Sequence, residues 1–141
     1  MNWHIFLRGL FFSIPRFLVL TVLMTSYLWI DWSPIPERPA LLILVYITHF
    51  AITYLFARWA FGKYRPHWKD VMVLFLAWML IQIGLESWYQ SVRTGGEFLK
   101  IATNYNWWSL LNIVVYAAAI FLAAERVMSK HHSDTPEGLE V

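Results

Sequence analysis

Residues 40–61 read ALLILVYITHFAITYLFARWAF, a run in which Arg58 is the only charged residue. An α-helix rises about 1.5 Å per residue, so a run of this length reaches about 30 Å, the thickness of a bilayer's hydrocarbon core. Three further apolar stretches occupy residues 17–30, 71–88 and 107–124. The sequence therefore predicts an all-α polytopic membrane protein with four transmembrane helices.

Composition supports this prediction and narrows the choice of partners. Of the 141 residues, 59 % are hydrophobic and 14 % are charged, whereas soluble domains average about 45–50 % and about 25 %. The lipid bilayer is the expected partner, and a net charge of +2 is too small to indicate nucleic acid. Because the chain has no Cys, disulfides and thiolate metal sites are excluded, and we predict no cofactor, no metal site and no catalytic residue.

The boundaries follow from prolines, glycines and charges between the apolar stretches. We predict a transmembrane domain over residues 15–128, with spans at about 15–32, 39–61, 70–90 and 105–126. Short connections between the spans predict an antiparallel four-helix bundle. Residues 129–141 are polar and contain Pro136 and Gly138, so they are expected to form a flexible tail.

The first fourteen residues have two interpretations. Their apolar residues follow the spacing of one helix face, which is typical of an amphipathic segment lying in the membrane interface. Ser13 followed by Pro15 favours a break before the first span, because serine caps helices and proline suits a first turn. The alternative is one long helix that continues into the span.

The positions of basic residues predict the orientation. If both termini share one side, that side holds eight basic residues and the other holds three. Cytoplasmic segments of membrane proteins are enriched in Lys and Arg, so both termini should be cytoplasmic. The eight are Arg8, Arg16, Arg58, Lys63, Arg65, Lys69, Arg126 and Lys130, and the three are Arg38, Arg93 and Lys100.

Each predicted span carries polar residues at helical spacing, such as Thr21 and Thr25 or His49 and Thr53. Polar side chains at membrane depth should face the bundle interior, since lipid offers them no hydrogen-bonding partner. They would form one cluster, either as hydrogen bonds that hold helices together or as the lining of a site. The candidate cluster is Thr25, His49, Gln82, Glu86, Ser109, Asn112 and Tyr116.

Two groups of charged residues could lie near the membrane surfaces. Glu86 precedes Trp88, so it could lie at the outer interface, paired with Arg93, rather than inside the bundle. Lys63, Arg65 and Lys69 lie in the connection after the second span and at the start of the third, where they are candidate contacts for anionic lipid.

Three functions remain open on sequence alone. The absence of a catalytic motif and the short connections favour a non-catalytic subunit or accessory factor that packs against other membrane chains or a second copy. The alternative is transport of a proton or small polar solute through the polar cluster, with Glu86 or His49 carrying the proton. A weaker alternative is an enzyme acting on a lipid or isoprenoid, with His49 and Glu86 as acid and base.

Overall fold

The computed structural model describes residues 2–30, 39–62, 64–103 and 107–133, with side chains over 2–26, 40–62, 64–100, 102 and 110–129. The described residues form helices α1 (Trp3–Ile30), α2 (Pro39–Phe61), α3 (Trp68–Thr94), α4 (Phe98–Thr103) and α5 (Trp107–Ser133). Four of these are long and apolar enough to cross a membrane, over Trp3–Ser26, Ala40–Phe61, Trp68–Thr94 and Leu110–Ser129. The prediction of an all-helical protein with four such helices is confirmed for the described part of the chain.

The N-terminal segment is not a separate helix. Helix α1 runs through Pro15 without a break, so the alternative of one continuous helix describes it. Pro15 has no amide hydrogen to donate to the carbonyl of Phe11, four residues earlier, and the helix nevertheless continues on both sides of it. Next to it, Ser13 donates its hydroxyl to the carbonyl of Leu10 (2.6 Å). The stretch apolar enough to span a membrane begins at Trp3 rather than Pro15, which moves Arg16 from its edge into its interior.

Two other segments differ from their predicted form. Residues 129–133, expected in a flexible tail, continue α5, whereas residues 134–141 lie outside the described part. The connection after α3 contains the short helix α4, which no sequence pattern indicated. Gly95 ends α3 at φ +69°, a left-handed conformation that glycine adopts without steric cost.

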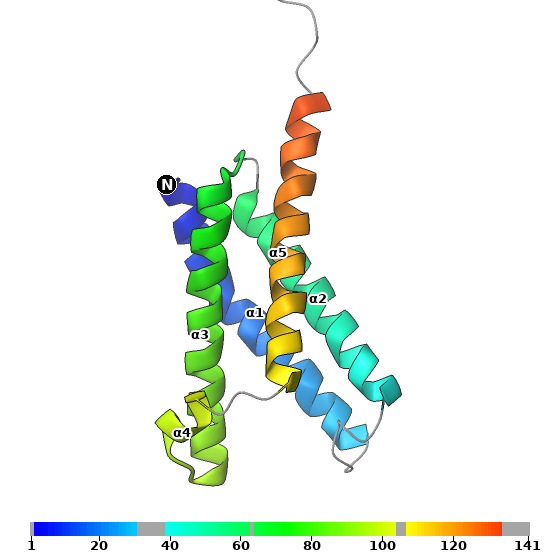
Figure 1. Ribbon diagram of the computed structural model, residues 1–141, viewed down its shortest axis with the longest axis vertical. Coiled ribbons are helices and arrows are strands. Elements are labelled where there is room, and N and C mark those ends of the chain that lie inside the picture. The colour runs from blue at the N-terminus through cyan, green and yellow to red at the C-terminus, as the bar shows by residue number, and fades with distance from the viewer. Residues whose placement is uncertain (1, 31–38, 63, 104–106, 134–141) are drawn as a thin grey trace, which may run out of the picture.

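The helices contact one another in a ring. Helix α1 contacts α2 and α3, and α5 contacts the same two helices. Figure 1 places the N-terminus, the α2–α3 connection and the end of α5 at one end, at the top of the view. The end of α1, the starts of α2 and α5, and the end of α3 lie at the other end, where α4 is found.

The half nearer the N-terminus is tightly packed, and we call it the closed half. It comprises residues 2–17, 52–62, 66–78 and 116–129, which are parts of α1, α2, α3 and α5 with the residues next to their ends. Several contacts involve small residues that let helix backbones approach closely, as transmembrane interfaces often do. Its fully buried apolar side chains include Ala57, Ala60, Phe61, Val71, Trp78, Ala119, Ile120, Ala123 and Ala124.

The other half, which we call the open half, comprises residues 18–30, 39–51, 79–94 and 107–115. Among its described side chains, only Leu20, His49 and Ser87 are buried. In the view of Figure 1, α2 and α3 diverge toward this end. The other described side chains of the open half are half-buried or exposed, so this half is less tightly packed than the closed half.

Candidate intramembrane polar site

Arg16 lies at the centre of the bundle. It occupies the middle of α1, and its side chain is 0 % exposed. Its Nη2 donates a hydrogen bond to Oε1 of Gln82 on α3 (2.8 Å), and its Nη1 donates to Oγ1 of Thr53 on α2 (3.4 Å). Arg16 was predicted to be one of the basic residues on the side of the termini, but the structure buries it inside the bundle, because the helix continues through Pro15.

Two aromatic rings hold the Arg16 guanidinium. Its Cζ lies 5.0 Å from the ring centroid of Trp78 and 4.7 Å from that of Tyr116 on α5. Such cation–π contacts stabilise by about 0.5–2 kcal/mol each, most when water is excluded. The Trp78 ring is itself fixed, since its Nε1 donates to the carbonyl of Gly9 on α1 (2.6 Å).

No carboxylate balances this cation among the described residues, where no ion pair involves Arg16. An arginine at the centre of a membrane helix costs about 2.5–3.5 kcal/mol even on the mildest scale. Neutral oxygens and aromatic faces from three other helices offset this cost. The site is therefore a single positive charge sealed among the four spanning helices.

His49 and Asn112 form the second part of the site. Nδ1 of His49 on α2 hydrogen-bonds Oδ1 of Asn112 on α5, and the imidazole meets the Tyr116 ring edge-on at a centroid distance of 6.0 Å. His49 is 6 % exposed. Tyr116 thus contacts both parts, with Arg16 over its face and His49 beside it.

Three buried polar atoms in this site have no hydrogen-bond partner within the described residues. They are Nε of Arg16, Nε2 of His49 and the hydroxyl of Tyr116. Buried polar atoms in folded proteins are nearly always paired, with protein or with ordered water. Their concentration around one tyrosine marks this place as the polar centre of the molecule.

Glu86 lies at the edge of this centre. It follows Gln82 by one helical turn on α3, and its carboxyl group interacts with the Gln82 side chain, although the residue is exposed in this chain. No hydrogen bond joins it to His49, so the acid–base pair required by the enzyme hypothesis is not formed. No ion pair joins it to Arg93, which is also exposed, so that expected pairing is not formed either.

The structure thus brings together part of the predicted cluster: Gln82, His49, Asn112 and Tyr116 contact one another directly or through Arg16. Thr25 is half-buried in the open half, and the side chain of Ser109 lies outside the described ones. Of the basic residues predicted to contact lipid, Arg65 and Lys69 are exposed, and Lys63 lies outside the described part.

The sequence contained a signal that Arg16 lies inside the membrane-spanning helix, although the first span was predicted to begin only at residue 15. Apolar residues predominate on both sides of Arg16, from Leu10 to Met24, and a charge inside such a run is unusual. Trp78, a tryptophan in the middle of the apolar stretch 71–88 rather than at one of its ends, lies against Arg16 in the structure.

Comparisons with known proteins supply no function for this site: the sequence matches no protein-family model, no curated protein and no solved structure.

Proposed function

We propose that the protein is a non-catalytic membrane subunit whose spanning helices form an antiparallel bundle with both termini in the cytoplasm. With Arg16 removed from the count, seven basic residues still accompany the termini, against three at the other end. The placement of the helix ends in Figure 1 supports this arrangement.

One observation carries the assignment as a subunit. Glu86 is exposed on a helix apolar enough to span a membrane, about two turns before the end of α3. A carboxylate facing acyl chains is costly, so exposed ionisable groups at such depth normally face a partner or water. A second chain that supplies a basic or hydrogen-bonding group beside Glu86 would remove this cost.

The surroundings of Glu86 suit another membrane helix. Leu80, Trp88 and Val92 on α3 are exposed by 60–69 %, and a Cβ added at Gly84 would meet nothing within 4 Å. A glycine with open space above it lets a neighbouring backbone approach closely. A partner helix seated here would complete the open half.

Photo-cross-linking in native membranes tests this proposal. A photoreactive residue at Gly84 should give a cross-linked adduct, and Glu86→Gln should weaken it. Ile47, exposed by 60 % on α2, is the control position and should give little adduct. A protein that purifies as a strict monomer, with no adduct at Gly84, contradicts the proposal.

The orientation has a separate test, because the chain contains no native Cys. Single cysteines at Lys69 and Lys100 mark the two ends. In intact cells, a membrane-impermeant maleimide should label Lys100→Cys and leave Lys69→Cys unlabelled until the cells are opened. The reverse pattern contradicts cytoplasmic termini.

The second candidate function is transport of a proton or small polar solute. It is favoured by the three unpartnered polar atoms around Tyr116, which would hold water inside the bundle. It ranks second because the described core of the closed half, beyond Arg16, is formed mainly by apolar side chains. In liposome flux assays, His49→Ala and Glu86→Gln should each reduce transport, with Ser26→Ala as control. Flux equal to wild type in both variants removes this candidate.

A further inference from the structure

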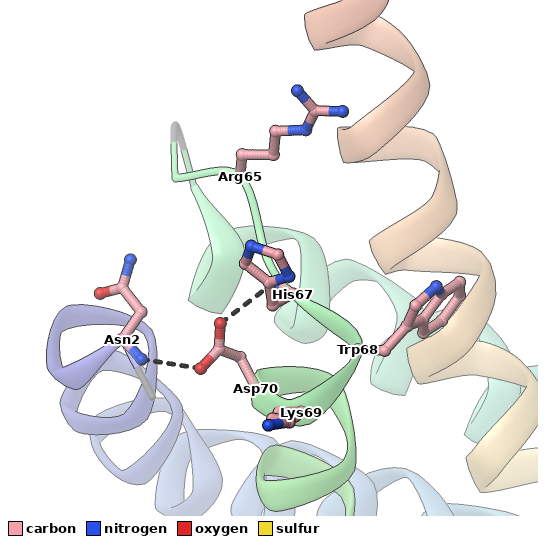
Figure 2. Close-up of a pocket in the computed structure, with 6 residues that line it drawn as sticks. All are labelled: Asn2, Arg65, His67, Trp68, Lys69 and Asp70. Carbon is pink, nitrogen blue, oxygen red and sulfur yellow. Dashed lines mark hydrogen bonds between the residues drawn. The ribbon is translucent and has the colours of Figure 1, made fainter.

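A hollow with basic residues opens at the N-terminal end of the bundle, away from the polar centre. It has a volume of about 650 Å³ and lies where the start of α1 meets the start of α3 (Figure 2). A neighbouring hollow of about 450 Å³ shares Arg65, His67 and Trp68 with it and extends to Met128 on α5. The first hollow is lined by Asn2, Arg65, His67, Trp68, Lys69 and Asp70.

The wall of the hollow is fixed by backbone hydrogen bonds. The Asp70 carboxylate accepts one from the amide of Asn2 (2.7 Å) and one from the amide of His67 (3.0 Å), which ties α1 to the first turn of α3. Pro66 is buried, and His4 stacks on Tyr64 at a centroid distance of 5.3 Å. The hollow is therefore a preformed feature of the closed half.

The free charges in the hollow are positive. Arg65 and Lys69 are exposed and form no ion pair with any described residue. Asp70 is 5 % exposed, and its two oxygens are already occupied by backbone amides. In Figure 2, Arg65 and Lys69 come from opposite sides of His67, and the Arg65 side chain extends away from it, so the two basic residues lie at different parts of the rim of the hollow.

The hollow lies at the level of the membrane surface. Trp68, at the start of α3, is 52 % exposed, and its ring stacks on Phe121 at 5.6 Å. Tryptophan at the end of a spanning helix takes the depth of the lipid headgroups, and basic pockets between such helices bind anionic headgroups. A lipid phosphate can thus enter from the side while its acyl chains stay beside Trp68 and Met128.

We infer that this hollow binds the headgroup of an anionic phospholipid, with Arg65 and Lys69 at its rim as the basic residues that attract the phosphate. Binding in this hollow requires only that the helices lie in a membrane, and it does not depend on a partner for Glu86.

The test measures binding of short-chain phosphatidic acid to the purified protein in neutral detergent, by native mass spectrometry or thermal shift. Wild type should bind it well above short-chain phosphatidylcholine. Each contact between a basic residue and an anionic lipid surface strengthens binding by about fivefold, so Arg65→Gln and Lys69→Gln should each weaken binding by about that factor. The double variant should weaken it by roughly twenty-five-fold.

The matched control is Arg126→Gln, which removes an exposed charge from α5 outside both hollows. It should leave binding within about twofold of wild type. Equal weakening by Arg126→Gln and Arg65→Gln would show diffuse attraction and overturn the site. Glycerol phosphate serves as a soluble phosphate without acyl chains, and binding as tight as that of the lipid would overturn the lipid assignment.

Discussion

The closed and open halves of the bundle are built from the same four helices, yet they differ in almost every contact. In the closed half, apolar side chains and small residues fill the space between the helices, and Asp70, Gly9 and Trp78 fix α1 against α3. In the open half, large apolar residues such as Leu80 and Trp88 point away from the chain. The difference indicates that one half holds the fold, whereas the other is available for a partner or for lipid.

The polar centre lies at the boundary between the two halves. Arg16 and Trp78 belong to the closed half, while Gln82, His49 and Asn112 belong to the open half. A cation placed there couples the halves, because its hydrogen bonds and ring contacts reach three other helices. Substitutions on either side of this boundary should therefore have very different costs.

The largest expected difference is between two tryptophans on α3. Trp78 is 0 % exposed, stacks on Arg16 and donates to Gly9, whereas Trp88 is 60 % exposed in the open half. Trp78→Ala should lower the free energy of unfolding by about 3–5 kcal/mol, because it leaves a cavity and an unstacked cation. Trp88→Ala should cost less than about 1 kcal/mol, as substitutions away from packed contacts usually do.

Unfolding by SDS in mixed micelles measures both variants. Purified protein without a partner is the right sample, since a partner helix would cover Trp88. Equal losses for the two variants would contradict the division into a closed and an open half.

The number of spanning helices and the inward position of their polar residues were predictable, because both follow from general properties of the bilayer. The bilayer thickness sets the length of a spanning helix, so the number and approximate positions of the four helices follow from hydropathy alone. The polar residues at helical spacing likewise had to face inward, which is why Gln82, His49, Asn112 and Tyr116 were found together.

The position of Arg16 was not predicted because the first boundary was placed by local rules. Ser13 and Pro15 resemble a helix start, but prolines are tolerated inside spanning helices, and α1 continues through Pro15. Packing against α2 and α3 then outweighed the local preference. The exposure of Glu86 depends on how far α3 diverges from its neighbours, a tertiary property that no pattern in the sequence records.

Two glycines give the next comparison, with effects of opposite sign. A Cβ added at Gly9 would lie 2.2 Å from Cδ1 of Leu74, which is itself buried, whereas one at Gly84 would meet nothing within 4 Å. Gly9→Ala should destabilise by about 1–3 kcal/mol through overpacking between α1 and α3. Gly84→Ala should stabilise by about 0.4–1 kcal/mol, because alanine restricts the unfolded chain and favours a helix. The same SDS titration measures both, and destabilisation by Gly84→Ala would show that the open half is packed after all.

The smallest expected loss of stability comes from removing the hydrogen bond between His49 on α2 and Asn112 on α5. Asn112→Leu removes the partner of His49 Nδ1 and leaves both nitrogens of that imidazole without a described partner. Interhelical hydrogen bonds in membranes contribute about 0.6 kcal/mol on average and reach about 1.7 kcal/mol. We expect a loss within this range, and Ser26→Ala, which removes a bond within α1 from Ser26 to the carbonyl of Val22, should cost almost nothing. If Asn112→Leu proves neutral or stabilising, His49 and Asn112 do not hold the helices together, and a role in binding water or solute becomes the better explanation for them.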